Sequence, residues 1–402
     1  MTVYEDFACA YLTEVDAAVR RMLTCGTEAV DLLNRAAVGD GQVRAFGNGG
    51  SSAIVRSALL QLQGRAGLPT ADSMMTPATL AYSAQRDYRT VFARSLAHNV
   101  EAVGLLVVAS VSGRSANIVE AVGLCRAHGI PVLALVGGDG TQIDPGHGMV
   151  WATGITDQQV SEDAMLTVLT LAAATVLDPD EAPLPARQER HLHALAAMVT
   201  AGLGVFLEEA TTAVADAIRT RRRIYVLCPD GGPLALAGEH FAHNLSWDAP
   251  LGVAEVQPPV VVSDLSLADM SAIYNDHPDP AHGVRYQLSS AAPGDVVFLL
   301  TYDSDGRTTR EAIRAAGEAG VRLFLLHRDG TAQPDAERLK LPPADDFALA
   351  ALVQSAAHLV CRTTRAALCA DHAAGTSAPS PHDLMAQDLA PLRELSDTTP
   401  SL

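Results

Sequence analysis

Two short segments rich in glycine and serine hold the residues best suited to bind and transform a ligand. Residues 46–52 read FGNGGSS, and residues 110–115 read SVSGRS. Glycines let the backbone approach an anion closely, helix N-termini direct N–H groups at it, and serine hydroxyls donate hydrogen bonds without adding a competing charge. The pattern predicts a site for the phosphate group of a small molecule, formed by Asn48, Gly49, Gly50, Ser51, Ser52, Ser110, Val111, Ser112 and Ser115.

Neither segment has the pattern of a nucleotide site. No Gly-Lys-Ser or Gly-Lys-Thr ending is present, and Ser52 stands where a dinucleotide fingerprint has its third glycine. Each turn taken alone could also be an ordinary loop rich in helix-capping residues. Two such turns in series favour the phosphate interpretation.

Each segment lies between an apolar stretch typical of a strand and a stretch typical of a helix. The first follows residues 43–46 and leads into 53–62, and the second follows 105–109 and leads into 116–128. Short apolar strands that alternate with helices predict a parallel sheet covered on both faces.

The second half of the chain repeats this order of elements. A second glycine pair, at residues 231–232, follows the apolar stretch 225–228, and two further apolar stretches occupy 296–301 and 321–326. The fold class predicted is therefore α/β, with two tandem doubly wound parallel-sheet domains of the Rossmann or flavodoxin type and flanking helices.

The segment between the halves, residues 178–185, reads DPDEAPLP and has the composition of a linker. Helical patterning begins each half, at 4–35 and at 188–219. The sequence predicts a first domain over 1–178, a linker over 179–187, a second domain over 188–370 and a tail over 371–402, in which 383–395 could form a short helix.

Composition excludes several classes of partner. The 402 residues carry a net charge of −18, which disfavours nucleic acid and acidic membrane surfaces because both are polyanions. No uninterrupted apolar segment reaches the roughly 20 residues that span a bilayer. The six cysteines form no CxxC pair and the N-terminus lacks a basic region followed by an apolar core, so a reduced, cytoplasmic protein is expected.

Residues 46–62 and 105–140 resemble the sugar isomerase (SIS) domain, and within it the phosphoheptose isomerases, which convert sedoheptulose 7-phosphate to a heptose 7-phosphate. FGNGGS matches that family's first motif, and SVSGRSAN is similar to its S-T-S-G-N-S-x-N motif. In the second half, residues 263–266 and the pair at 275–276 are similar to the family's S-D-x-S and G-N-D segments. The resemblance implies a phosphorylated sugar as ligand, a phosphate loop that includes Ser51, and active sites built where subunits meet.

The resemblance also directs attention to metal ligands, because family members hold a metal, usually zinc, through a histidine, two acidic or amide groups and a second histidine. In the first half, the matching positions are poor zinc ligands: Ser57, Gln61, Ser161 and Leu169. We therefore expect no cofactor there.

The second half departs from the family in the opposite way. His240 and His358 match the two metal histidines, while Asn244 and Ala350 replace the other ligands. His240 and His358 are thus the remaining metal candidates, or simply core histidines.

The second phosphate loop is degenerate. Pro233 replaces its first serine, and residues 301–305 read TYDSD, which would place Asp303 and Asp305 against a phosphate. Like charges repel, so this half is not expected to bind phosphate there. We expect one composite site instead, in which His240, His243 or His358 lies near a sugar held by the first half, and a homodimer that forms a pseudo-tetramer.

Interconversion of an aldose and a ketose phosphate needs a base to move a proton between C1 and C2, and a group that polarises the carbonyl. The candidate acid–base residues are Glu162, Glu239, His240 and His358. Glu162 could also be a solvated charge near a helix N-terminus. Asp87 and Asp276 occupy places where the family has a substrate-contacting aspartate.

Three functions remain open at this point. The first is a sugar-phosphate isomerase acting on a heptulose or similar ketose phosphate. The second is a noncatalytic sugar-phosphate-binding or regulatory protein, which the missing metal ligands would allow. The third is a different sugar-phosphate transformation on the same scaffold.

Overall fold

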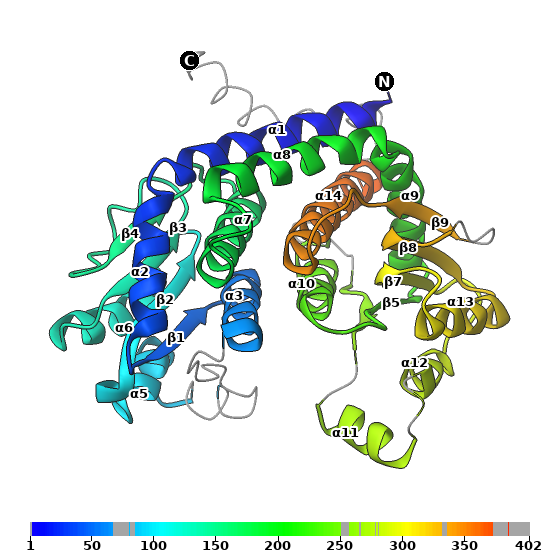
Figure 1. Ribbon diagram of the computed structural model, residues 1–402. Helices are drawn as coiled ribbons and strands as arrows, with labels where there is room; N and C mark the ends of the chain where they lie inside the picture. The colour runs from blue at the N-terminus through cyan, green and yellow to red at the C-terminus, as the bar shows by residue number, and fades with distance from the viewer. Residues whose placement is uncertain are drawn as a thin grey trace. The chain divides into compact units, whose positions relative to one another are not determined.

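The computed structural model describes residues 2–66, 80, 85–250, 257–264, 267–277, 279, 281–331, 336–372 and 385. The chain divides into two compact units, each with its own parallel sheet (Figure 1). The amino-terminal unit comprises residues 14–192, and the carboxy-terminal unit comprises residues 1–13 and 193–402. The tail helix predicted at 383–395 lies outside the described residues, apart from Met385.

Among the described residues, the sheet of the amino-terminal unit has four parallel strands in the order β1-β2-β3-β4. Their bounds are Gln42–Gly47, Val103–Ser110, Val132–Val136 and Met149–Ala152. All strands run the same way, so the loops after their carboxyl ends gather at one edge of the sheet. That edge carries both glycine- and serine-rich segments.

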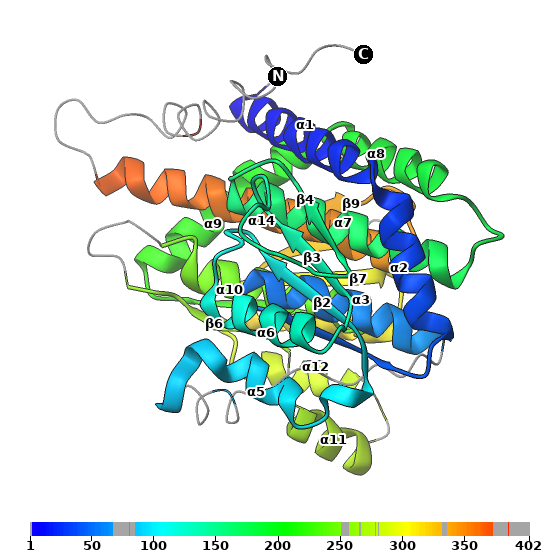
Figure 2. The same cartoon turned by 90° about the vertical axis from the view of Figure 1, so that its left-hand side faces the viewer.

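Helices cover both faces of this sheet. Helices α5 (Val91–Ala97) and α6 (Ala116–Ala127) lie over one face (Figure 2), where they pack with side chains of β2 and β3. The opposite face carries α2 (Gly26–Val38), α3 (Gly50–Ala66) and α7 (Gln158–Leu177), and α7 contacts both of the other helices. Burial on both faces explains why β2 carries no polar side chain before Ser110, rather than alternating. Two short 3-10 helices, η1 (Tyr88–Thr90) and η2 (Val100–Ala102), flank α5.

The helix α7 is long and apolar enough, by length and composition, to cross a membrane. Its most apolar window is 83% buried within the protein, as expected for a core helix. Glu162 and Asp163 interrupt its apolar sequence and are themselves buried.

In the part of the carboxy-terminal unit that the structure describes, the sheet has five parallel strands in the order β6-β5-β7-β8-β9. In chain order the strands are β5 (Arg223–Leu227), β6 (Val260–Val262), β7 (Val296–Asp303), β8 (Arg322–Asp329) and β9 (Glu337–Lys340). Helices α12 (Ala281–Leu288) and α13 (Arg307–Ala319) pack on one face. The other face contacts α9 (Leu203–Arg219) and α10 (Pro233–Trp247), and α14 (Asp346–His372) packs on these two helices; α11 (Leu267–Asp276) precedes α12.

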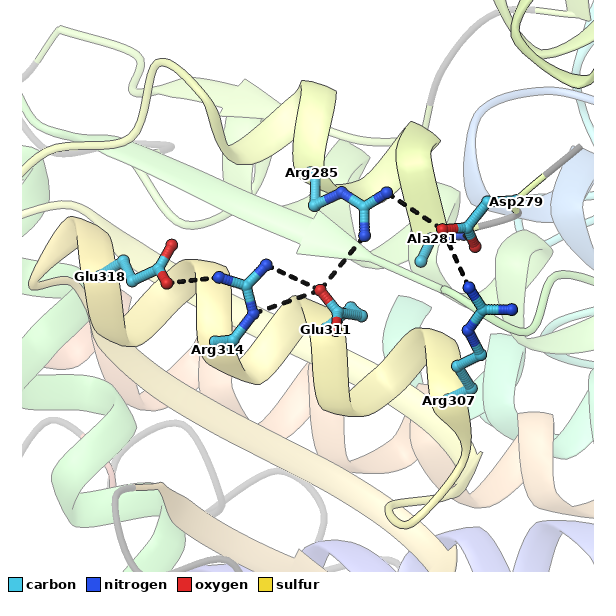
Figure 3. Close-up of polar contacts among 7 residues, drawn as sticks. All are labelled: Asp279, Ala281, Arg285, Arg307, Glu311, Arg314 and Glu318. Atoms are coloured by element: carbon cyan, nitrogen blue, oxygen red, sulfur yellow. Dashed lines mark hydrogen bonds and ion pairs between the residues drawn. The ribbon is translucent and has the colours of Figure 1, made fainter. Parts of the chain in front are cut away.

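A chain of ion pairs holds α12 against α13 (Figure 3). Asp279 accepts hydrogen bonds from the backbone N–H of Ala281 and from Arg285, and it forms an ion pair with Arg307. Glu311 bridges Arg285 and Arg314, and Arg314 reaches Glu318. Single exposed ion pairs contribute little, so the connected set acts mainly by fixing the orientation of the two helices.

Two parallel α/β regions confirm the predicted fold class. Each of the helical stretches predicted at 4–35 and 188–219 is two helices, namely α1 (Val3–Leu23) with α2, and α8 (Leu184–Thr200) with α9. Gly202, with φ of 94°, allows the break between α8 and α9. The division between units falls within α1 and α8. The predicted boundaries at 178 and 188 stay a prediction, although residues 184–187 of the predicted linker are helical.

Candidate functional site

A cavity of about 740 Å³ opens at the carboxyl edge of the amino-terminal sheet. Both segments singled out in the sequence contribute to its wall, through Asn48, Ser51, Ser110, Ser112 and Ser115. The cavity is therefore lined by an amide and four hydroxyls that could donate hydrogen bonds to an anion.

The first loop depends on its glycines. A Cβ atom on Gly47 would lie 2.4 Å from the carbonyl oxygen of Ser51, so only glycine fits there. Gly49 has φ of 52°, and its carbonyl oxygen accepts a hydrogen bond from the N–H of Ser52. Ser51 is consequently placed in the first turn of α3, where helical N–H groups lack intrahelical partners. The predicted residues Gly49, Gly50 and Ser52 shape this turn rather than line the cavity.

The second loop turns sharply between β2 and α6. Gly113, with φ of 62°, donates its N–H to the carbonyl oxygen of Ser110, and Ser112 accepts a hydrogen bond from the N–H of Arg114. The hydroxyls of Ser110 and Ser115 lie 3.2 Å apart. Both hydroxyls thus point into the same small region at the start of α6, where the helix dipole favours a negative charge.

An amide pair joins the two loops. Asn48 and Asn117 exchange hydrogen bonds of 3.0 and 2.8 Å, and the hydroxyl of Tyr88 donates to the side-chain oxygen of Asn48 at 2.8 Å. Asn117 is 1% exposed, and its side-chain oxygen also accepts from the N–H of Ile118. This network fixes the position of Asn48 at the cavity wall. The only sequence signal for Asn117 was its place at the end of the SVSGRSAN segment.

A third loop, after β3, lines the cavity and was missed as a binding element. Asp139 accepts hydrogen bonds from the N–H and hydroxyl of Thr141, which lower the pKa of its carboxyl below the usual range. Gly137 could not carry a side chain, because its Cβ would lie 2.4 Å from the carbonyl oxygen of Val111. The Gly-Asp-Gly turn at 138–140 was the available signal, since a similar turn ends the matching strand of the second half.

Glu162 is the predicted acid–base residue that lines this cavity. It lies near the start of α7, is 2% exposed, and its carboxylate is 3.4 Å from the side-chain nitrogen of Gln158. Such burial rules out the alternative of a solvated charge at a helix end. Thr156 and Gln142 complete the polar wall with groups that can bond sugar hydroxyls.

The positions that would hold zinc in the amino-terminal unit do not fit a metal. Ser161 donates its hydroxyl to the carbonyl oxygen of Ile155 at 2.9 Å, which is a structural role. Ser57, Gln61 and Leu169 are buried and supply neither imidazole, thiolate nor carboxylate. No step of a mechanism in this unit can therefore be assigned to a metal held there.

His240 and His358 come together in the carboxy-terminal unit. Their rings are 5.0 Å apart at 86°, and both are almost completely buried. His240 Nδ1 lies 2.8 Å from the side-chain oxygen of Gln354, and His358 Nδ1 lies 3.4 Å from the hydroxyl of Tyr11. Two imidazoles and an amide fall short of the four donors of a structural zinc site. Their predicted place beside the amino-terminal phosphate loop stays a prediction.

The remaining candidates lie elsewhere. Glu239 and His243 are exposed on α10. Asp87 caps η1 by accepting a hydrogen bond from the N–H of Arg89, and Asp276 accepts one from the side chain of Asn275 at the exposed end of α11. None of these four side chains lines the cavity.

A parallel sheet covered by helices, with glycine- and serine-rich loops after its first two strands, places the protein in the α/β class. Residues 8–137 match the family model described as the SIS domain. The phosphoheptose isomerase of Neisseria meningitidis serogroup C (strain 053442) is 30% identical over 153 residues, which are 36% of this chain and 78% of that protein. The chain therefore belongs to the SIS domain family, which confirms the resemblance read from the sequence.

Two further comparisons agree. The phosphoheptose isomerase of Thiobacillus denitrificans is 31% identical over 145 residues, which are 33% of this chain and 73% of that protein. The C-terminal domain of glucosamine-fructose-6-phosphate aminotransferase from Francisella tularensis superimposes with a TM-score of 0.59 at 11% identity, covering 91% of this chain and 96% of that one. The latter similarity concerns the fold alone, and it extends over both units.

Asp264 gives the carboxy-terminal unit an expected pH dependence. Its carboxylate accepts a hydrogen bond from the N–H of Cys228, and burial, with a smaller effect of Glu239, raises its pKa from 3.8 to about 6. The folded state then binds the proton more tightly than the unfolded state, so stability falls as pH rises from about 4 to about 6. We expect the natural chain to lose on the order of 3 kcal/mol of its free energy of unfolding over this range through Asp264. Asp264→Asn should abolish this loss, as measured by urea unfolding at pH 4 and pH 7.

The matched control for this prediction is Asp276→Asn, because Asp276 is exposed. The stability difference between that variant and the natural chain should not change with pH. If Asp264→Asn shows the same pH slope as the natural chain, the assignment to Asp264 is wrong.

Proposed function

We propose that this protein is a sugar-phosphate aldose–ketose isomerase acting on sedoheptulose 7-phosphate or a similar ketose phosphate. The observation that carries the proposal is that the carboxylate of Glu162 and the hydroxyls of Ser51, Ser110, Ser112 and Ser115 line one cavity. The serine loops would hold the phosphate, and the carboxylate would act on the carbon end of the sugar. The similarity to phosphoheptose isomerases supports the same reaction.

In this proposal Glu162 takes a proton from C1 of the ketose and returns it to C2 of the enediol. The hydroxyl proton on C1 is lost and the carbonyl oxygen on C2 gains one, so the reaction is balanced without a redox partner. Thr156 and Gln158, which lie on the same wall, would hydrogen-bond the two oxygens. This reaction needs no zinc in the amino-terminal unit, where Ser57 and Leu169 stand at positions that hold metal ligands in the family.

A noncatalytic sugar-phosphate-binding protein is the second candidate, favoured by the loss of the family's metal ligands at Ser57, Gln61, Ser161 and Leu169. The proposal also includes a homodimer, in which two chains supply four domains, and a cytoplasmic location.

Incubation with sedoheptulose 7-phosphate tests the proposed function. We expect conversion to a heptose 7-phosphate without added zinc, followed by NMR through loss of the ketose signals and through deuterium uptake at C2 in D₂O. Thermal stabilisation by the sugar phosphate without turnover would support the binding protein instead. If the protein showed no turnover and no stabilisation, both candidate functions would be contradicted.

A further inference from the structure

The loops of the carboxy-terminal unit can be matched to the phosphate loops of the amino-terminal unit by strand register. Phe46 pairs with Val108 in the first sheet, and Leu227 pairs with Leu299 in the second. Phe46 and Val108 pack in the core with α6, the helix that follows β2. Leu227 and Leu299 pack in the core with α13, the helix that follows β7, so the two residue pairs face equivalent sides of their sheets. Ser110 lies two residues after Val108, and Thr301 lies two residues after Leu299. Thr301 therefore occupies the place of the cavity-lining serine, and Tyr302 the place of Val111.

A carboxylate of the chain itself bonds to these two residues. Asp230, three residues after the end of β5, accepts a hydrogen bond from the hydroxyl of Thr301 at 2.5 Å and one from the N–H of Tyr302 at 2.8 Å. Both bonds reach the same oxygen, Oδ2. A hydroxyl and a backbone N–H that converge on one anionic oxygen are the donors that a phosphate would use in the other unit.

The aspartates that the sequence placed against a phosphate make hydrogen bonds of their own within the loops. Asp303 accepts a hydrogen bond from the N–H of Asp305, and Asp305 accepts bonds from the N–H and hydroxyl of Thr331. Asp303 thus caps its own turn, as Ser112 does in the other unit, while Asp305 holds the loop after β8. That Asp303 and Asp305 face the anion position stays a prediction, whereas Asp230 is the carboxylate that bonds Thr301 and Tyr302.

The neighbouring groups are consistent with a filled position. Pro233, the first residue of α10, offers neither the hydroxyl nor the N–H that Ser51 brings to α3. The hydroxyl oxygen of Tyr302 lies 3.3 Å from where a Cβ on Gly232 would be, so the ring stands over the glycine loop. Thr301 is buried, whereas Asp230 is exposed on its outer side, so solutes can reach the position.

We propose that Asp230 is a built-in anion that takes the place of a phosphate group in the carboxy-terminal unit. This unit then keeps the loop conformation of a liganded SIS domain without any ligand. Each chain binds phosphate in the amino-terminal unit alone. The inference concerns the carboxy-terminal loops only and stands apart from the proposed catalytic activity.

Anion rescue of Asp230→Ala tests this inference. Removing the carboxylate leaves the N–H of Tyr302 without its acceptor and leaves the hydroxyl of Thr301 with the longer contacts to the carbonyl oxygen of Asp303 and to Thr309, so we expect Tm to fall by about 2–4 °C. Millimolar inorganic phosphate should then raise the Tm of Asp230→Ala by about 2 °C more than it raises that of the natural chain. Equal phosphate-induced shifts in the two proteins would overturn the proposal.

The control is Asp216→Ala, which removes a carboxylate of the same unit that pairs with Arg219 on α9. Phosphate should shift its Tm by the same amount as that of the natural chain. Should Asp230→Ala fail to fold, calorimetric titration of the natural chain with inorganic phosphate decides the question. Two sites per chain would overturn the inference, and one site supports it. No phosphate binding at all would contradict the proposed function. It would still agree with the inference that the carboxy-terminal unit does not bind phosphate.

Discussion

Ser112→Asp is expected to lower the affinity for a sugar phosphate about 10²–10³-fold. The side chain of Ser112 lines the cavity in the turn between β2 and α6, beside the hydroxyls of Ser110 and Ser115. A carboxylate about 4 Å from a phosphate is repelled by roughly 4 kcal/mol at an effective dielectric constant near 20, and each 1.4 kcal/mol is tenfold in affinity. Isothermal titration calorimetry with sedoheptulose 7-phosphate measures the loss.

Ser112→Asn is the matched control for this change. The amide has nearly the shape of the carboxylate but carries no charge, so its affinity should fall by less than about tenfold. Loss of equal size in both variants would show that the turn was disrupted sterically. Unchanged affinity in Ser112→Asp would remove the serine loops from the binding site.

Glu162→Gln is expected to lower turnover of the sugar phosphate by about 10²–10⁴-fold, with a smaller change in KM. The substitution keeps the size of a side chain that is buried at the cavity wall, but an amide cannot accept the proton from C1. Deuterium uptake at C2 should fall in parallel with turnover, because both depend on the same proton transfer. Sugar-phosphate affinity should be retained, since the serine loops are intact.

Glu239→Gln provides the comparison, because Glu239 was an equal candidate by sequence and is exposed on α10. Its turnover should match that of the natural chain. If Glu162→Gln retained full deuterium uptake, Glu162 would not be the base, and the proposed reaction would need another proton acceptor.

The sequence alone determined the layered fold, and it predicted the two loops that line the cavity. Strands β1, β2, β3, β5, β7 and β8 follow from apolar runs, because a strand covered on both faces has mostly apolar positions. The edge strands β4, β6 and β9 were missed, since they have only three or four residues each. The two serine loops were identified because glycine and serine are required wherever a backbone turn approaches an anion.

Only the tertiary structure decided which side chains meet within those loops. Asn117 locks Asn48 across 69 positions, and Asp230 bonds Thr301 across 71 positions. Such contacts depend on the register of parallel strands, which sets how far each loop extends past the edge of the sheet. Sequence motifs give the residues of one loop at a time. The contact of Asp230 with Thr301 and Tyr302 therefore came from the folded strands, not from the composition of either loop.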